Sequence, residues 1–224
     1  MRRVEGEALA PLGPGAWGLY VITDRQQTGG RSLEEIITGA LAGGARAFQL
    51  REKDLPARDL CRLAERLLVR TRPAGALLLI NDRVDVALGV GADGVHLTRR
   101  SLPPAAVRAL LRPGMRLGVS CHTREEALEA EAGGADFVLL GPVFPTPAKA
   151  AYGPPAGPPL IRQVRPAVAC PVLAVGGITA HNAGEVLEAG ADGVAAISAV
   201  MGAPDVAAAT RALLAAVRRA PRPI

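Results

Sequence analysis

The strongest constraint on the fold is a glycine-rich phrase that occurs four times, each time just before a short apolar run. The four copies are residues 42–45, 91–94, 132–136 and 189–193. Glycine ends helices because it adopts the left-handed conformation without strain, and a short apolar run rich in β-branched or aromatic residues is typical of a buried strand. Each copy therefore predicts a helix that ends just before a strand.

Four further apolar runs lie among these copies, which brings the expected strands to eight. The eight expected strands are residues 18–23, 48–50, 76–80, 95–97, 117–120, 137–140, 171–175 and 194–197. The intervals carry helix signals, because Ser32 with Glu35, and Thr123 with Glu126, have the spacing of a capping box. Strands and helices therefore alternate along the chain.

This alternation within 224 residues predicts an α/β protein with the fold of a single (β/α)8 TIM barrel. A doubly wound open sheet is the alternative, because it is built from the same alternation. We expect the barrel to span residues 17–218, preceded by an N-terminal extension over 1–16 and followed by a tail over 219–224.

The composition excludes several function classes. The formal net charge is +5, but three Phe, two Tyr and one Trp offer little to stack on nucleobases, so we expect small anionic ligands and no nucleic acid. Three scattered cysteines are typical of a reduced, cytoplasmic protein. No apolar run is long enough to span a bilayer and no signal peptide is recognised, so no membrane partner is expected. A homo-oligomer is left open.

Lysine occurs at only two positions, Lys53 and Lys149, and every other cationic side chain of this kind is arginine. Both lysines follow an expected strand by a few residues. A compact ammonium is one way in which proteins bind phosphate. Chance under an arginine-rich composition is the alternative, and the position of the two loops decides between them.

Barrels of this class place their chemistry at the carboxyl ends of the strands, where two subsites can be separated. Gly176 and Gly177 follow the seventh expected strand, and Ser198 follows the eighth. Backbone N–H groups of these two loops commonly bind phosphate in barrels, although a tight turn alone would also explain the glycines.

The second subsite would surround a more highly charged anion, and its candidates are Arg51, Lys53, Asn81, Asp82 and Lys149. Asp82 fits a magnesium ligand, because a hard cation prefers a carboxylate and often shares it with phosphate oxygens. A salt bridge between Asp82 and Arg83, or a helix cap at Asp82, is the alternative.

Several segments together resemble the thiamine phosphate synthase and TenI family, from about Leu19 to Leu214. The segments are residues 48–53, 80–87, 91–97, 141–147 and 175–178, in the order that the family shows. The resemblance implies a (β/α)8 barrel that joins 4-amino-2-methyl-5-(diphosphooxymethyl)pyrimidine to thiazole phosphate. The products would be thiamine phosphate and diphosphate, with Mg²⁺ as the cofactor.

The resemblance also implies roles for single residues. Those implied to bind the pyrimidine diphosphate are Gln49, Arg51, Lys53, Asn81, Ser120 and Lys149. Those implied on the thiazole phosphate side are Thr146, Gly177, Ile197 and Ser198, with Asp82 as the metal ligand. The reaction needs no protein nucleophile, because the electron-rich aminopyrimidine can expel diphosphate and leave a stabilised methylene cation. The candidate catalytic residues are Arg51, Lys53, Ser120, His122 and Lys149.

Two positions depart from the synthase pattern. Ser101 stands where synthases usually carry a second magnesium aspartate, and Ala148 stands where they carry a second threonine. Ser101 also fits an ordinary N-cap of the helix expected to begin at Leu102. The departures favour a TenI-like thiazole tautomerase, in which His122 would match the proton carrier.

The retained diphosphate set favours the synthase over the tautomerase, and a non-catalytic phosphate-binding barrel is the third hypothesis. Of the remaining chemically active side chains, His96 and His181 are expected to be structural or on the surface. Cys121 is expected to be a small packed residue and not a nucleophile.

Overall fold

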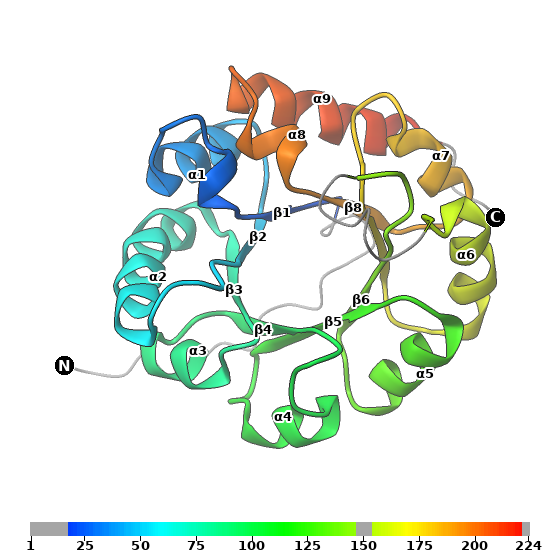
Figure 1. Ribbon diagram of the computed structural model, residues 1–224, viewed down its shortest axis with the longest axis horizontal. Helices are drawn as coiled ribbons and strands as arrows, with labels where there is room; N and C mark the ends of the chain where they lie inside the picture. The colour runs from blue at the N-terminus through cyan, green and yellow to red at the C-terminus, as the bar shows by residue number, and fades with distance from the viewer. Residues whose placement is uncertain (1–17, 147–153, 221–224) are drawn as a thin grey trace.

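The computed structural model describes residues 18–146 and 154–220 of the chain. Eight parallel strands form a closed barrel in sequence order, with helices around it (Figure 1). The strands are β1 (Leu19–Ile22), β2 (Ala47–Leu50), β3 (Leu77–Asn81), β4 (Gly94–Leu97), β5 (Arg116–Cys121), β6 (Phe137–Leu140), β7 (Val172–Val175) and β8 (Gly193–Ala196). Every predicted strand is confirmed, and the open sheet is wrong because β8 pairs with β1.

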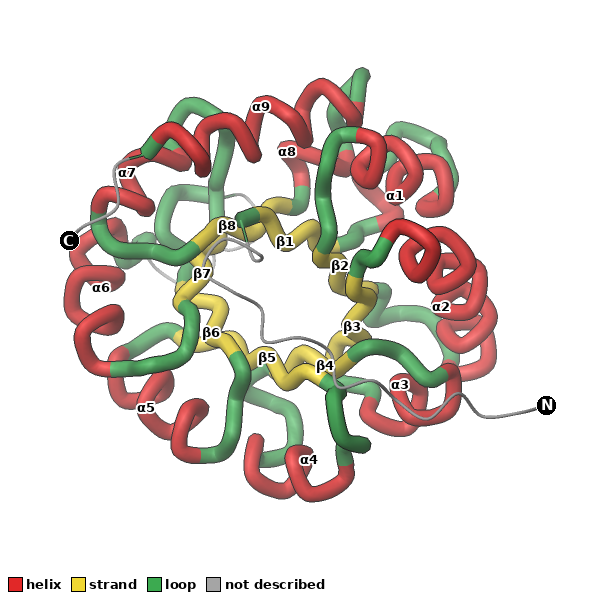
Figure 2. Tube along the Cα trace, turned by 180° about the vertical axis from the view of Figure 1, so that it is seen from behind, coloured by secondary structure: helices red, strands yellow, loops and turns green. Residues whose placement is uncertain are grey.

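Helices follow the strands and form the outer ring of the molecule (Figure 2). They are α1 (Leu33–Ala42), α2 (Ala57–Thr71), α3 (Val84–Val90), α4 (Pro104–Leu110), α5 (Arg124–Ala132), α6 (Gly157–Val164), α7 (Ala183–Glu188), α8 (Ser198–Met201) and α9 (Val206–Arg219). The Ser32 and Glu35 capping box at α1 is confirmed in both of its hydrogen bonds. Within the described ranges, no helix is both long and apolar enough to cross a membrane.

The repeated glycine phrase ends a helix in the same way in all four copies. The glycines with a left-handed backbone are Gly44, Gly91, Gly134 and Gly190, with φ of 103°, 66°, 87° and 107°. The alanine after each glycine donates its N–H to the carbonyl five positions earlier, which is the hydrogen bond of a Schellman cap. The glycine-rich phrase therefore has a structural role, because it ends a helix just before the amino end of the next strand.

Three of the four copies continue with an aspartate that ties neighbouring strands together. The carboxylates of Asp93, Asp136 and Asp192 accept the backbone N–H of Leu78, Leu117 and Val172, at 2.8, 2.7 and 2.8 Å. These acceptors lie at the amino ends of the strands, opposite the rim where barrels carry chemistry. The recurring aspartates therefore stabilise the barrel and do not belong to the site.

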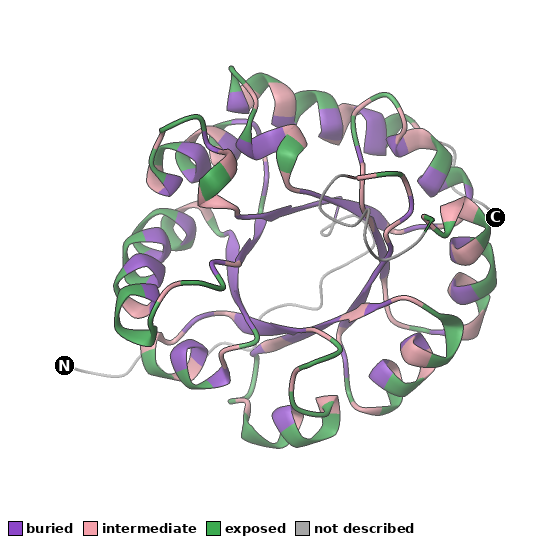
Figure 3. Cartoon of the chain, in the orientation of Figure 1, coloured by how far each residue is buried: buried purple, intermediate pink, exposed green. Residues whose placement is uncertain are grey.

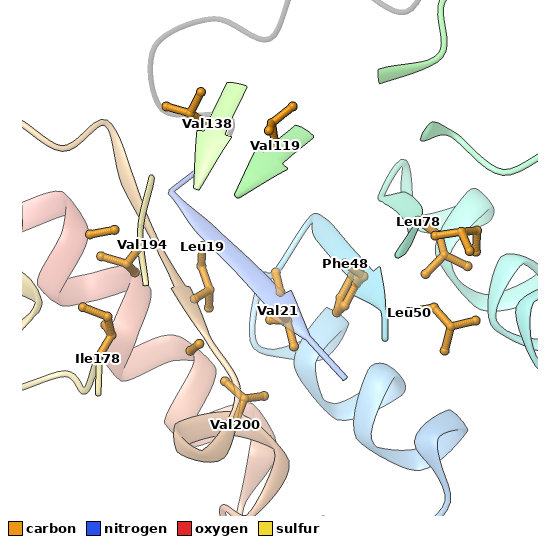
Figure 4. Close-up of a cluster of buried hydrophobic side chains, with 14 of the residues drawn as sticks. Leu19, Val21, Phe48, Leu50, Leu78, Val119, Val138, Ile178, Val194 and Val200 are labelled. Carbon is orange, nitrogen blue, oxygen red and sulfur yellow. The ribbon is translucent and has the colours of Figure 1, made fainter. Parts of the chain in front are cut away.

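Alternation along each strand sorts the buried side chains into two clusters, as period-two geometry requires. The outward cluster packs under the helices, and Figure 4 shows Leu19, Val21, Phe48 and Leu50 within it. The inward cluster fills the barrel and consists of Tyr20, Ile22, Ala47, Leu77, Leu79, Phe137, Leu139, Leu173 and Ala195. The strands are accordingly buried on both faces (Figure 3), which fixes their carboxyl ends as a rigid platform.

Candidate active site

Among the described residues, the polar side chains that point into the barrel near the carboxyl ends of the strands come from one half of its wall. Gln49, Asn81, His96 and Ser120 occupy inward positions near the carboxyl ends of β2, β3, β4 and β5. The facing half, from β6 through β8 to β1, contributes Leu139, Ala195 and Ile22 to the inward apolar cluster. The barrel mouth therefore has a polar wall and an apolar wall, which suits a ligand that combines charged groups with an uncharged ring.

Tyr20 on β1 orients Gln49 of the polar wall through a hydrogen bond inside the barrel. Gln49 Nε2 donates to the Tyr20 hydroxyl at 3.3 Å, and both side chains are buried. Burial raises the pKa of Tyr20 far above its ordinary value, so the phenol stays protonated. This hydrogen bond uses one amide proton of Gln49, so the second amide proton and the carbonyl oxygen can bind a ligand.

The loop after β2 carries both Arg51 and Lys53, and a buried glutamate anchors it. The Thr23 hydroxyl accepts the Arg51 N–H at 2.9 Å and donates to Glu52 Oε1 at 2.6 Å. Arg25 adds a bond from Nη1 to Glu52 Oε2 at 3.0 Å. Glu52 is 6 % exposed, whereas Lys53 is exposed on the same loop. This network fixes the backbone that presents the two predicted cations.

Asp82 is held in an unusual conformation at the carboxyl end of β3. Its φ is 64°, a left-handed value that costs a side-chain-bearing residue about 1 kcal/mol. Its N–H donates to the His96 carbonyl at 2.8 Å, and the residue is exposed. The alternative roles predicted for Asp82 are wrong, because Arg83 pairs with Asp85 and is itself the N-cap of α3. The carboxylate therefore stays available at the rim.

His96 is buried inside the barrel among aromatic rings. Its ring centroid is 5.8 Å from that of Tyr20 and 5.7 Å from that of Phe137. Its Nε2 lies 2.9 Å from Ser120 Oγ. Burial, with the positive charge of Arg51, lowers the pKa of His96 to about 3, so the ring is neutral. Arg51 itself lies one residue beyond the carboxyl end of β2.

His122 follows β5 and is held by the helix that comes after it. Its backbone N–H donates to Glu126 Oε2 at 2.7 Å, and Nδ1 lies 3.1 Å from the same oxygen. Glu126 thus serves His122 instead of closing the capping box at Thr123, whose hydroxyl still accepts the Glu126 N–H. A carboxylate that orients an imidazole is a suitable arrangement for proton transfer. His181 is exposed, as expected.

The predicted phosphate side lies at the ends of β7 and β8. Gly176 and Gly177 have φ of 101° and 63°, and a Cβ at Gly177 would come within 2.6 Å of the Pro145 carbonyl oxygen. Only glycine fits there, because the loop after β6 packs against it. Ser198 begins α8 and is exposed, and Ile197 precedes it as the N-cap. The glycines therefore form a tight turn whose small size also admits a ligand close to the backbone.

Two predicted positions lie outside the described residues, and the role expected for Ser101 differs in the structure. Thr146 is half-buried next to the glycine turn, whereas Lys149 and Ala148 lie outside the described residues. Ser101 is not the N-cap of α4, since that helix begins at Pro104 after Pro103. The Ser101 hydroxyl instead accepts the Thr98 N–H at 2.8 Å and closes a turn. The convergence of Lys53 and Lys149 stays a prediction.

A separate groove of about 570 Å³ lies between the loop before α1 and the helix α2. Three of its arginines form ion pairs with nearby carboxylates. Arg25 pairs with Glu52 and Asp54, Arg62 pairs with Asp59, and Arg66 pairs with Glu34. These carboxylates offset the positive charge. We therefore assign the ligand site to the barrel mouth and not to this groove.

Comparison with known proteins identifies the family. The model of the family described as thiamine monophosphate synthase matches residues 19–200, which is most of the barrel. The chain belongs to the thiamine monophosphate synthase family. It is 50 % identical over 204 residues to a thiamine-phosphate synthase of Moorella thermoacetica, covering 91 % of this chain and 97 % of the relative. It is 52 % identical over 203 residues to that of Roseiflexus castenholzii, covering 91 % and 89 %.

A solved structure supports the same family. The thiamine phosphate pyrophosphorylase from Pyrococcus furiosus superposes with a TM-score of 0.84 at 42 % identity, covering 92 % of this chain and 98 % of that one. The family resemblance read from the sequence is therefore confirmed, together with the (β/α)8 fold.

Sequence reasoning missed three residues that support the candidate site through hydrogen bonds: Tyr20, Thr23 and Glu52. Tyr20 looked like one more apolar strand residue, and its hydrogen bond to Gln49 depends on pairing between β1 and β2. Glu52 had a detectable signal. If the period-two alternation of β2 continues beyond the strand, Glu52 points the same way as Leu50, away from the barrel interior. Its charge therefore had to be met by the neighbouring loop and not by a ligand.

Proposed function

We propose that this protein is a thiamine phosphate synthase, a transferase of thiamine biosynthesis. It would condense 4-amino-2-methyl-5-(diphosphooxymethyl)pyrimidine with thiazole phosphate to give thiamine phosphate and diphosphate. The observation that carries the proposal is the two-sided barrel mouth, with Gln49, Asn81 and Ser120 on the polar wall and the glycine turn at Gly177 after β7. Two anionic groups joined by uncharged rings match this layout.

Magnesium fits the acidic group at the rim. The Asp82 side chain is exposed, and the neighbouring Arg83 guanidinium pairs with Asp85 instead. In the part of the chain that the structure describes, no three acidic, histidine or cysteine residues are arranged so that they could together hold a metal ion. The remaining ligands of the ion would therefore be water and substrate oxygens, as magnesium commonly accepts. When bound, the ion would help to neutralise the leaving diphosphate.

The chemistry follows from charge. The bond between the methylene carbon and the diphosphate oxygen breaks, and its electron pair leaves with diphosphate. The aminopyrimidine stabilises the resulting cation, and the thiazole nitrogen donates its lone pair to form the new carbon–nitrogen bond. Arg51 and Lys53 would offset the charge of the leaving group, and Ser120 would donate a hydrogen bond to it. Gly177 and Ser198 would hold the thiazole phosphate so that the nitrogen is in line.

The remaining predicted contacts fit the same scheme. Gln49 and Asn81 would bind the pyrimidine diphosphate, and Lys149 would reach it from the loop after β6. Thr146 and Ile197 would line the thiazole phosphate side. The barrel domain limits of 17 and 218 and a cytoplasmic location are proposed on the composition and pattern of the sequence.

One observation favours a second candidate function. His122 is oriented by Glu126, which is an arrangement suited to moving a proton, as a thiazole tautomerase would require. The tautomerase has no diphosphate to neutralise, so the paired cations of the β2 loop support the synthase more strongly.

The two functions are separated by one assay. The purified protein is incubated with the pyrimidine diphosphate, thiazole phosphate and Mg²⁺, and thiamine phosphate is measured by chromatography. We expect product, and we expect Asp82→Asn to lose most of it while His122→Gln retains most of it. No product at high enzyme concentration, with turnover of the thiazole carboxylate phosphate tautomer instead, would show that the synthase assignment is wrong.

A further inference from the structure

His96 is a buried polar side chain for which the proposed chemistry has no use. It is 1 % exposed and packs between Tyr20 and Phe137 inside the barrel. Gly118 lies opposite it on β5, where a Cβ would come within 2.6 Å of His96 Nδ1 and 2.3 Å of Phe137 Cζ. The ring therefore has little room to turn, and its two nitrogens keep fixed directions.

The two nitrogens have different surroundings. Nε2 lies 2.9 Å from Ser120 Oγ, whereas Nδ1 is buried and has no hydrogen-bond partner among the described residues. A neutral imidazole carries one proton, and the nitrogen that carries it must donate. A buried N–H without an acceptor is rarer in proteins than a buried lone pair without a donor. The proton therefore belongs on Nε2, which donates to Ser120.

This tautomer decides what the Ser120 hydroxyl can do. Because one lone pair of Oγ accepts from His96, the hydroxyl proton must point to another acceptor. Ser120 is half-buried near the carboxyl end of β5, and Arg51 follows the carboxyl end of β2 at the same mouth of the barrel. An acceptor arriving beside a guanidinium is an anionic oxygen.

We infer that His96 is a positioning residue: as the Nε2–H tautomer it keeps the Ser120 hydroxyl as a hydrogen-bond donor to a diphosphate oxygen of the ligand. The opposite tautomer would accept the Ser120 proton and turn the lone pairs of Oγ toward the anion, which would repel it. The identity of the natural ligand rests on the proposed function, but the donor role of Ser120 does not.

The tautomer is measured directly on the unmodified protein. Two-dimensional ¹H–¹⁵N NMR with ¹⁵N-labelled histidine gives separate signals for His96, His122 and His181, and His96→Gln assigns the first. We expect the His96 pattern of a protonated Nε2 and a bare Nδ1. The pattern of a protonated Nδ1 would overturn the inference.

The consequence for binding is measured by calorimetry with inorganic diphosphate and Mg²⁺ as the probe. His96→Phe keeps a ring of similar size but has no donor, so we expect about tenfold weaker binding, equivalent to about 1.4 kcal/mol. His96→Gln can place an amide N–H where Nε2 lies and is expected to restore most of the affinity. The matched control is His181→Gln, at an exposed position, which should bind as the unmodified protein does.

A double substitution separates positioning from general damage to the barrel. Once Ser120→Ala has removed the hydroxyl, His96→Phe should cause little further loss of diphosphate binding, because its effect acts through that hydroxyl. Additive losses would overturn the inference. If diphosphate binding shows this coupling but no thiamine phosphate is formed, the proposed function fails and the role of His96 stands. If thiamine phosphate is formed without the coupling, the reverse holds.

Discussion

Replacing Glu52 by Gln should destabilise the protein far more than replacing its neighbour Asp54 by Asn, although both carboxylates bind Arg25. Glu52 is 6 % exposed and accepts bonds from the Thr23 hydroxyl at 2.6 Å, from the Arg25 N–H at 3.2 Å and from Arg25 Nη1 at 3.0 Å. Asp54 is exposed and accepts from Nη1 and Nη2 of the same guanidinium, at 2.6 and 2.5 Å.

The expected magnitude follows from these contacts. Hydrogen bonds to a buried charge contribute roughly 1.5–3 kcal/mol each, but Gln still accepts from one or two of the donors. We therefore expect Glu52→Gln to lower the free energy of unfolding by about 3 kcal/mol, within the range for breaking one side of a buried ion pair. In a protein of this size the melting temperature would fall by roughly 6–12 °C. For Asp54→Asn we expect no measurable change, because solvent already screens the pair.

Urea denaturation of the two variants and the unmodified protein at pH 7 measures these differences, provided that the slopes of the transitions agree. A second readout is the KM for the pyrimidine diphosphate. It should rise in Glu52→Gln, because the Thr23 and Glu52 network holds the Arg51 backbone. The reasoning is refuted if Glu52→Gln is no less stable than Asp54→Asn, or if it loses stability while the KM stays unchanged.

Four other outcomes are expected. Gly118→Ala should lower the free energy of unfolding by about 1–3 kcal/mol, because its Cβ would overlap two fixed rings; an unchanged urea midpoint would contradict this. Asp82→Gly should abolish most synthase activity without loss of stability, since glycine accepts φ of 64° freely, and Asp82→Asn separates the charge from the backbone effect. Asp136→Ala should cost about 1–2 kcal/mol by leaving the Leu117 N–H unpaired, with activity per folded molecule unchanged. Finally, burial holds the pKa of His96 near 3, below its unfolded value of about 6.5, so the unfolded state takes up the proton first. Stability should therefore fall as the pH drops from about 6 to 4, by about 1.4 kcal/mol per unit from this group, and His96→Gln should show a shallower decline in acid denaturation curves.

Much of the candidate site could be found from the sequence because it follows a positional rule. Gln49, Asn81 and Ser120 were recognised as polar residues at the ends of apolar strands, and closure of the barrel brings them to one rim. Tyr20 and Glu52 were missed because their roles depend on partners from the neighbouring strand or the loop that follows it. Alternation beyond β2 indicates that Glu52 points away from the barrel interior, but its partners Thr23 and Arg25 follow β1 and are not indicated by the sequence around Glu52.

Ser101 shows how local reasoning goes wrong. A serine ahead of two prolines fits an N-cap by spacing alone, but the chain turns back on itself and the hydroxyl closes that turn with Thr98. Capping and turn formation use the same hydroxyl and the same distance along the chain, so only the backbone path decides between them.

The sequence by itself determined the strands, the helix ends and the family, because apolar periodicity, left-handed glycines and motif order are local properties that need no partner. The tertiary structure alone decided that β8 closes on β1, that the polar wall spans β2 to β5, and that His96 keeps one nitrogen for Ser120. These facts depend on strand register and on burial, which arise only when residues distant in the chain exclude water from each other.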